Sequence, residues 1–367
     1  MNRTHCIICN GDISFLYRFD NFPIYMGISS GIDEYKDQNW YICKQCGTIQ
    51  LKDLISLEKL YSVPHNPAIG QTWQRHNRNF ADYITKYGKK SILEIGGGNC
   101  KIADNVLSNN SSIKYTIYDK HAYKNTRNGV IFIDKFYNPD EILDNEIYDT
   151  IVMSHVFEHI YDPNLYLQSF NKNLNVGGRV IFSIPNITKI LEDKFTNGLN
   201  FEHTYQIDNK ILRYLMTKNG FKEISVYDYS SHNIFAVFEK VSNMNISCKL
   251  NCFDQNMSIW KDFINYHTKT TKILRGLIKP YNNKFLFGCH VFSQYLLHFG
   301  LDENSFNGII DNDPNKHGHR LYGTNLKTYP ANIIEGMNSV AVIVKAGLYS
   351  KEITDSLLSI NENCVII

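Results

Sequence analysis

The 367-residue sequence predicts an α/β protein built from three consecutive parts. Three observations indicate this class. Two C-x-x-C pairs stand near the N-terminus, a glycine-rich turn follows a short apolar segment in the centre, and strand-like and helix-like segments alternate through the rest. At roughly 150 residues per domain, two to three domains are expected. We place them at residues 1–62, 63–245 and 246–367.

Composition narrows the class of protein. The chain has 38 basic and 36 acidic residues, a net charge of +2, which gives no field strong enough to favour nucleic acid or an anionic membrane as partner. Hydrophobic residues make up 43%, enough for several buried cores. No apolar run approaches the roughly 20 residues that span a bilayer, and the first residues lack a secretory h-region. We expect a cytoplasmic protein, and the sequence leaves its oligomeric state undetermined.

The first part carries the four clustered cysteines. Cys6 and Cys9 are separated by 33 residues from Cys43 and Cys46. Each C-x-x-C turn presents two thiolates to one ion, and two such turns complete a tetrahedral zinc shell. A strand-like segment precedes Cys43 and Gly47 follows Cys46. The alternative, a redox dithiol, would normally occur once, beside a βαβ unit. A four-thiolate zinc site has no open position, so we expect structural Zn²⁺.

The central glycine turn follows a predicted strand over residues 89–95 and opens a predicted helix at Lys101. Glycines at Gly96 and Gly98 allow backbone amides to approach a ligand closely. Glu94 stands two positions before the first glycine, where its carboxylate would repel a pyrophosphate and pair with an ammonium group. This favours S-adenosylmethionine over NAD as the ligand.

The following strands fit that ligand. A strand over 114–118 ends at Asp119, which suits the two ribose hydroxyls of a nucleoside. A strand over 130–133 ends at Asp134, which could accept from an adenine amine. A fourth strand covers 148–153, and a glycine turn leads into a fifth that ends at Pro185.

Residues 75–240 resemble the class I S-adenosylmethionine-dependent methyltransferases, with a Rossmann-like core. The resemblance rests on EIGGGN, the acid at Asp119, YDTIVMSHVFEHI and L-x-x-GGRVIFSIPN, which occur in the family's order and spacing. It implies that Glu94, Gly96 and Gly98 cradle the methionine and ribose part of the cofactor. It also implies that Asp119 binds the ribose, Asp134 lies by the adenine and His155 lies at the lip of the pocket.

The last third predicts a second, smaller α/β domain. A helix over 257–279 precedes a strand and glycine turn at 284–288, a helix over 291–299, and strands near 306–310, 339–344 and 364–367. Gly288 lacks the further glycines that seat a pyrophosphate, so we expect no second dinucleotide here.

The order of the three parts resembles the zinc-binding sugar C-methyltransferases, which act on nucleotide-linked keto-deoxysugars. Their D-x-x-P-x-K-x-G segment is matched by residues 311–318. Methyl transfer requires a His or carboxylate base near the methyl group, and His155, His159 and His203 all follow predicted strands. The resemblance implies that His203 is the base, that Glu202 orients it or contacts the acceptor, and that His159 binds a small, nucleotide-linked acceptor. A core or capping role for His159 remains open.

The sequence departs from that family at its tyrosines. Residues 65–72 and Asn200 occupy the positions of tyrosines that would polarise a ketone, and His65 and His76 could replace some of those contacts. Carbon methylation is therefore in doubt and an oxygen acceptor is reasonable. Three further alternatives stay open: O-methylation of another small metabolite, methylation of nucleic acid or protein, and a nucleotide-binding scaffold without turnover.

Overall fold

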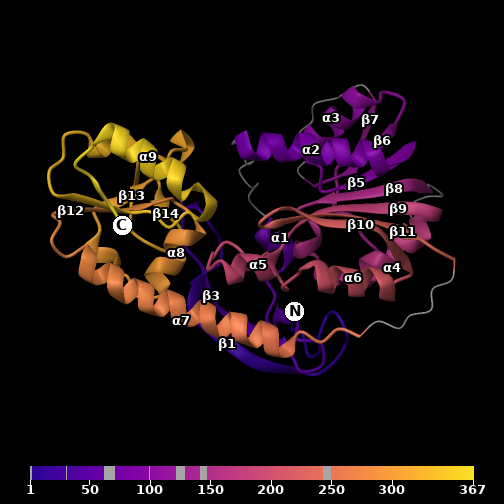
Figure 1. Cartoon of the computed structure of the whole chain (residues 1–367), viewed down its shortest axis with the longest axis horizontal. Coiled ribbons are helices and arrows are strands. Elements are labelled where there is room, and N and C mark those ends of the chain that lie inside the picture. The colour runs from indigo at the N-terminus through magenta and orange to yellow at the C-terminus, as the bar shows by residue number, and fades with distance from the viewer. Residues whose placement is uncertain are drawn as a thin grey trace.

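The computed structural model describes residues 2–29, 31–61, 71–98, 100–120, 129–140, 147–242 and 249–367. Within these residues the strands form a three-stranded, a seven-stranded and a five-stranded sheet, and one small two-stranded pair. In Figure 1 the seven-stranded sheet and the C-terminal sheet lie side by side, and the N-terminal strands run below both of them. None of the helices in these ranges has the length and apolar character needed to cross a membrane.

The N-terminal sheet is antiparallel, in the order β1-β3-β4. Its strands are β1 (Ile13–Pro23), β3 (Tyr35–Cys43) and β4 (Ile49–Leu51), and α1 (Leu57–Leu60) follows. The strand predicted before Cys43 is therefore present. The turn before β1 and the turn between β3 and β4 carry the two cysteine pairs.

The central sheet has the order β10-β11-β9-β8-β5-β6-β7. Only β11 runs antiparallel to its neighbours. The strands are β5 (Ser91–Ile95), β6 (Lys114–Tyr118), β7 (Val130–Ile133), β8 (Tyr148–Ser154), β9 (Leu174–Pro185), β10 (Phe221–Ser230) and β11 (Asn233–Lys240). The order reverses between β5 and β8, so a ligand crevice is expected at their carboxyl ends. The predicted α/β class with a central parallel sheet is confirmed.

Helices flank this sheet (Figure 1). They are α2 (Gln71–Tyr87), α3 (Lys101–Asn109), η1 (Phe157–His159), α4 (Pro163–Asn173), α5 (Ile187–Glu192) and α6 (Asn209–Lys218). Asp162 and Asp208 cap α4 and α6, because each side chain accepts from backbone N–H groups of the first turn. α3 begins directly after the glycine turn, as predicted.

The C-terminal sheet is parallel, in the order β15-β13-β12-β16-β17. Its strands are β12 (Asn283–Phe287), β13 (Gly308–Ile310), β15 (Thr328–Tyr329), β16 (Val340–Ile343) and β17 (Val365–Ile366). The helical elements are α7 (Phe253–Leu277), α8 (Val291–His298), η2 (Glu303–Ser305), η3 (Pro314–Lys316), η4 (Ala331–Ile334), η5 (Gly347–Tyr349) and α9 (Ser350–Ile360). α7 begins four residues before the predicted start.

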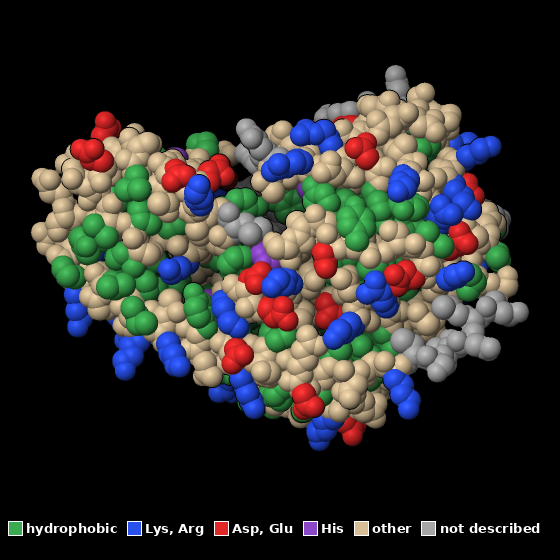
Figure 2. Space-filling model, viewed as in Figure 1, with side chains coloured by type: hydrophobic (Ala, Val, Ile, Leu, Met, Phe, Trp, Pro, Cys, Tyr) green, Lys and Arg blue, Asp and Glu red, His purple; other side chains and the backbone are tan. Residues whose placement is uncertain are grey.

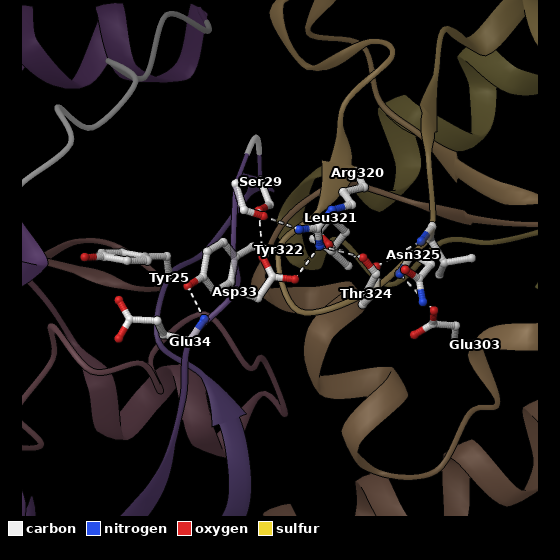
Figure 3. A network of polar contacts seen from close by, with 12 residues as sticks. Tyr25, Ser29, Asp33, Glu34, Glu303, Arg320, Leu321, Tyr322, Thr324 and Asn325 are labelled. Carbon is white, nitrogen blue, oxygen red and sulfur yellow. Dashed lines mark hydrogen bonds and ion pairs between the residues drawn. The ribbon is translucent and has the colours of Figure 1, made fainter.

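The N-terminal and C-terminal parts are joined by a polar network (Figure 3). β2 (Ile28–Ser29) pairs with β14 (Arg320–Leu321) in an antiparallel ribbon. Arg320 forms an ion pair with Asp33, and the backbone N–H of Glu34 donates to the Tyr322 hydroxyl at 2.6 Å. Residues 28–34 and 320–322 thus hold the N-terminal and C-terminal parts together.

Candidate functional site

The four N-terminal cysteines form a compact cluster. The Sγ atoms of Cys6 and Cys46 are 3.6 Å apart, and those of Cys9 and Cys43 are 3.5 Å apart. Four thiolates placed about 2.3 Å from a zinc ion in a tetrahedron lie roughly 3.8 Å from one another. The backbone N–H groups of Gln45 and Cys46 both point at Cys43 Sγ, at 3.4 Å. The donor set and its spacing therefore fit a tetrahedral metal ion.

The glycine turn after β5 packs its backbone closely against two carboxylates, Glu94 and Asp119. Gly96 has a φ of +81° and donates its N–H to the Tyr118 carbonyl at 2.8 Å, which joins the ends of β5 and β6. A Cβ on Gly97 would lie 2.6 Å from the carboxyl carbon of Glu94. A Cβ on Gly98 would lie 2.9 Å from Oδ2 of Asp119. Gly97 was not among the predicted site residues, although it shields Glu94 as closely as Gly98 shields Asp119.

Glu94 lies at the floor of this crevice and is 2% exposed. The Tyr115 hydroxyl donates to its Oε2 at 2.9 Å. Burial raises the pKa of Glu94 to about 7; the Tyr115 hydrogen bond lowers it, and the charges of Asp119 and Asp104 raise it further. A buried acid of this kind gains most from a cationic ligand. The residues therefore fit the ammonium group of S-adenosylmethionine.

The two other predicted cofactor acids follow neighbouring strands. Asp119 follows β6 and donates its backbone N–H to the Ile133 carbonyl at 3.2 Å, so it lies beside the end of β7. Asp134, directly after β7, is exposed. The structure brings Glu94, Gly98 and Asp119 together and places Asp134 at the outer end of the same row of strands.

His155 directly follows β8 and lies at the edge of a second cluster, beside Glu158. Its backbone has a φ of +52°, and its N–H donates to the Ser183 carbonyl at 2.8 Å. Its ring lies 4.9 Å from that of Trp73 and 5.3 Å from that of His76. His76 is 3% exposed and its Nε2 bonds to Ser183 Oγ at 2.8 Å, so its imidazole is committed to the core. His65 lies outside the described residues.

The second cluster brings together the predicted catalytic residues. His159 Nδ1 lies 3.7 Å from Glu202 Oε2, and the rings of His159 and His203 are 5.0 Å apart. Glu158, which was not predicted, lies between the histidines: its Oε1 is 3.4 Å from His155 Nδ1 and 3.9 Å from His159 Nε2. Its side chain is 1% exposed, and Oε2 makes no hydrogen bond within the described part of the chain.

The signal for Glu158 was present in the sequence, as the acid of the S-H-V-F-E-H segment between two histidines. Burial alone would raise its pKa, but the hydrogen bond from His155 and the nearby imidazoles of His159 and His203 lower it overall. Burial and the charge of Glu158 raise the pKa of Glu202 to about 7. The cluster therefore holds one ionised carboxylate and one that titrates near neutrality.

His203 is fixed in one tautomer. Its Nδ1 lies 3.1 Å from the Gly198 carbonyl, which can only accept, so Nδ1 carries the proton and Nε2 keeps a free electron pair. Burial lowers the pKa of His203. Asn200 holds the loop, because its Oδ1 accepts from the N–H groups of Glu202 at 2.8 Å and His203 at 2.7 Å. This explains why an asparagine can stand at the tyrosine position.

A tyrosine nevertheless lies beside the cluster. Burial raises the pKa of Tyr61, and the charges of Glu202 and Glu158 raise it further, which places its phenol within their field. Tyr61 does not occupy either of the two positions, 65–72 and Asn200, at which the family's tyrosines are missing. Tyr61 comes from the N-terminal part, so its approach to Glu202 depends on how the two parts pack.

The loop after His203 is attached to the N-terminal part. Leu51 N–H donates to the Thr204 carbonyl at 2.9 Å, and Gln206 N–H donates to the Ile49 carbonyl at 2.7 Å. Arg3 is 6% exposed and donates to the carbonyls of Thr204 at 2.7 Å and Tyr161 at 2.8 Å. The cysteine-bearing part thus directly supports the Glu202–His203 segment.

The histidine cluster has a second chemical capacity. Glu158, His159 and His203 offer ligand atoms that lie within 4.8 Å of one another. Two imidazoles and one carboxylate are a recognised ligand set for divalent transition metals. The arrangement can therefore either accept a proton at His203 or hold a cation, and metal analysis separates the two.

Comparisons with known proteins match the part of the chain that forms the central sheet. Residues 73–226 match the family model described as "Methyltransferase domain". No curated protein matches the sequence.

Three solved structures each resemble less than half of this chain. An S-adenosylmethionine-dependent methyltransferase from Listeria monocytogenes is 14% identical, with a TM-score of 0.36, over 44% of this chain and 98% of its own. The N-methyltransferase NodS from Bradyrhizobium japonicum is 13% identical (TM-score 0.36), over 48% of this chain and 100% of its own. An O-methyltransferase family protein from Burkholderia thailandensis is 11% identical (TM-score 0.37), over 46% of this chain and 58% of its own.

The family match covers β5 to β9, the first part of β10, the glycine turn and the histidine cluster. Residues 73–226 thus form a methyltransferase domain.

Proposed function

We propose that the protein transfers the methyl group of S-adenosylmethionine to a small, nucleotide-linked sugar or sugar-like acceptor, with His203 as general base. The observation that carries the base assignment is the contact of His203 Nδ1 with the Gly198 carbonyl, which leaves Nε2 unprotonated. His203 also stands in one cluster with His159, Glu202 and Glu158, and Glu158 in turn contacts His155.

The cofactor supplies a methyl group on a positively charged sulfur, so the chain's own residues need only position the reactants and remove a proton. Glu94 binds the ammonium end and Asp119 the ribose, while Asp134 lies toward the adenine. His203 would take the proton that the acceptor atom loses, while the bond of that atom to the methyl carbon forms, the sulfur–methyl bond breaks and S-adenosylhomocysteine leaves. His159 and Glu202 bind the acceptor or orient the base.

The Cys6, Cys9, Cys43 and Cys46 cluster is proposed to hold one structural Zn²⁺. Four thiolates fill its coordination shell, so the ion would stabilise the fold and take no part in the reaction. Its role would be indirect, since the part that it holds together also supports Thr204, next to His203.

The small-acceptor proposal is supported by the resemblance in the order of the three parts and by the buried, compact cluster around Glu158 and His203. Tyr61 adds a phenol near Glu202, which keeps carbon methylation beside oxygen methylation as a possible outcome. Nucleic acid and protein acceptors are the competing class, and the net charge of +2 gives them no electrostatic support.

Methyl transfer should be measured with labelled S-adenosylmethionine and a panel of keto-sugars and hydroxy-sugars linked to UDP, GDP, CDP and dTDP, with bulk tRNA and a protein extract as separate arms. Label in a sugar fraction supports the proposal, and mass spectrometry of the product identifies the methylated atom. Label only in tRNA or protein overturns it. Tight cofactor binding without transfer to any arm would favour the scaffold alternative.

A further inference from the structure

Three side chains of the histidine cluster converge on one point. Glu158, His159 and His203 each offer one ligand atom, and these atoms lie within 4.8 Å of one another. Glu158 Oε1 is 3.9 Å from His159 Nε2, a separation too long for a hydrogen bond. Two atoms bound to one transition-metal ion at about 2.1 Å lie roughly 3.4 Å apart in a tetrahedron. Small side-chain rotations would therefore close the three ligands around an ion.

Both histidines are oriented as metal ligands usually are. A metal-bound imidazole normally donates its other ring N–H to a carboxylate or a backbone carbonyl. His203 Nδ1 lies 3.1 Å from the Gly198 carbonyl, so Nε2 is the nitrogen with the electron pair. His159 Nδ1 lies 3.7 Å from Glu202 Oε2, while its Nε2 faces Glu158. Each Nδ1 thus has an acceptor nearby, and Nε2 is the nitrogen that each ring can offer to an ion.

Glu158 supplies the negative charge that such a site needs. Its side chain is 1% exposed, and Oε2 makes no hydrogen bond within the described residues. A buried polar atom without a partner indicates that a partner is missing. The ion pairs of this carboxylate that the structure describes are with histidines, and none is with Lys or Arg. A bound divalent cation would balance the buried charge.

The cluster can be reached from solvent. The side chains of His159 and Glu202 are 20% and 11% exposed. Figure 2 shows the surface hollowed between the C-terminal domain and the central part, with acidic and basic side chains mixed around the hollow. The face in view therefore has no acidic patch there that would collect cations unselectively. Three protein ligands leave at least one coordination position to water, so an ion here exchanges more readily than one enclosed by four thiolates.

From these observations we infer that Glu158, His159 and His203 form a binding site for a divalent transition-metal ion, separate from the cysteine cluster. Two imidazoles and one carboxylate suit Zn²⁺, Co²⁺ and Ni²⁺. A bound ion occupies Nε2 of His203, the atom that accepts the proton in the proposed reaction, so the metal-loaded enzyme is inhibited. Only this inhibition rests on the proposed function, because metal binding is independent of methyl transfer.

Co²⁺ is the probe for the site, because its visible absorption reports its ligands. The full-length protein should bind one equivalent of Co²⁺ with visible d–d bands that lack a near-ultraviolet thiolate charge-transfer band. That thiolate band identifies any cobalt bound at the cysteine cluster instead. Zn²⁺ should displace the cobalt, whereas Mg²⁺, which prefers oxygen ligands, should not. If all bound cobalt shows the thiolate band, or if no cobalt binds, the site is refuted.

Two variants each remove one ligand. Glu158→Gln and His203→Ala should weaken Co²⁺ binding by more than about 100-fold, since losing an outer-shell partner alone costs about 10- to 100-fold. Glu202→Gln keeps all three ligands and should weaken binding by about tenfold. His319→Ala, at an exposed position, is the matched control and should bind like the wild type. Circular dichroism and S-adenosylmethionine binding establish that each variant is folded. Folded ligand variants that bind Co²⁺ like the control would overturn the site.

Glu158→Gln also tests the inhibition, because it keeps His203 but lacks the carboxylate ligand. Saturating Co²⁺ should lower kcat of the wild type by roughly 100-fold, the usual effect of losing a general base. The same Co²⁺ concentration should leave Glu158→Gln at its own metal-free rate. Co²⁺ binding without inhibition would overturn the blocking of His203 and leave the site in place. Absence of Co²⁺ binding would overturn the site, whatever the rate of methyl transfer.

Discussion

Glu94 and Glu202 are both carboxylic acids with a pKa of about 7, and burial is the main cause at each. The neighbouring charges that raise the two pKa values further differ. Glu94 lies near Asp119 and Asp104, whereas Glu202 faces Glu158. The first arrangement suits the binding of a cation, and the second places a titrating acid next to the proposed base.

Glu94→Gln is expected to stabilise the ligand-free protein at high pH. The folded pKa of Glu94 lies above its ordinary value of 4.5, so the stability that its protonated form contributes is present at low pH and is lost as the pH rises toward 7. The amide still accepts from Tyr115 and never ionises. The gain over wild type should therefore grow between pH 5 and pH 8, to at most about 3 kcal/mol.

Urea unfolding at both pH values measures this difference, and Glu362→Gln at an exposed position is the control. The same variant should weaken S-adenosylmethionine binding at pH 8, as measured by calorimetry. A stability difference that does not change with pH would show that Glu94 does not carry the shifted pKa.

His203→Ala should lower kcat by roughly 100-fold or more, the usual effect of losing a general base. Affinity for S-adenosylmethionine should stay the same, since Glu94, Gly98 and Asp119 are untouched. Glu202→Gln should cost less. Because burial lowers the pKa of His203 below 6.5, the base stays neutral at pH 7, and kcat should fall only below about pH 6.5.

The exposed His319→Ala is the matched control and should behave like the wild type. Near-normal turnover of His203→Ala would move the role to His159 or His155. Loss of a second equivalent of metal in His203→Ala, beyond the one in the cysteine cluster, would instead assign His203 as a metal ligand.

Among the elements, β4 and the segment after His203 show how the N-terminal part supports the site. Arg3→Met should lower kcat by about tenfold and leave cofactor affinity unchanged, because Arg3 holds Thr204 and Tyr161 through their carbonyls. Methionine fills a similar volume without a buried charge, so the fold should persist. Arg18→Met, at a half-exposed position on β1, is the control.

Steady-state kinetics and calorimetry separate the two readouts for Arg3→Met. An equal loss of kcat and cofactor affinity would indicate general damage to the domain. Arg3→Lys should recover part of the rate, since an ammonium group can still reach one of the two carbonyls.

Metal analysis of the wild type and of Cys43→Ser tests whether the cysteine cluster binds zinc. The wild type should hold one equivalent of zinc, and Cys43→Ser should lose it, because three thiolates bind the ion less tightly. Residues 1–60 should then exchange amide hydrogens faster, while cofactor affinity changes little. Cys364→Ser, at a buried cysteine in the C-terminal sheet, should keep the metal. Protein prepared without chelator that contains no zinc would refute the assignment.

The elements were largely predictable and their contacts were not. Strands such as β5, β6 and β8 are short apolar runs that end at Gly or Asp, so local pattern located them. The segments that meet at the site are far apart in the chain: Arg3 and Thr204 are separated by 201 positions. Periodicity carries no signal across such distances, which is why Arg3 and Tyr61 were missed. Glu158 was missed because its role depends on burial beside three histidines.

At the scale of the whole molecule, α7 connects the zinc part to the C-terminal domain. At its start, Cys252 N–H donates to the Cys46 carbonyl at 2.9 Å, and Asn256 Nδ2 donates to the Gly47 carbonyl at 2.9 Å. Toward its end, Thr271 Oγ1 donates to the Phe299 carbonyl at 3.0 Å. Figure 1 shows α7 running beside β1 and β3 from one part to the other. Order at the cysteine cluster should therefore extend along this helix.

The three tryptophans of the chain provide a test of that coupling. Trp40 and Trp260 pack together at the junction of β3 and α7, with ring centroids 5.6 Å apart, whereas Trp73 lies against His155 in the methyltransferase domain. In Trp73→Phe, all tryptophan emission reports the junction. Zinc chelation should shift this emission to longer wavelength, because the start of α7 loses its ordered partners at Cys46 and Gly47 and both indoles become hydrated.

The double variant Trp40→Phe, Trp260→Phe is the matched control, since its emission comes from Trp73 alone. The emission spectrum of this double variant should not shift on zinc chelation. It should still change when S-adenosylmethionine binds, because the cofactor crevice belongs to the central sheet and not to the N-terminal sheet. A shift in both proteins would mean that zinc holds the entire fold. Unchanged emission from Trp73→Phe after verified zinc loss would mean that aromatic packing alone, including the Trp40–Trp260 contact, keeps α7 in place.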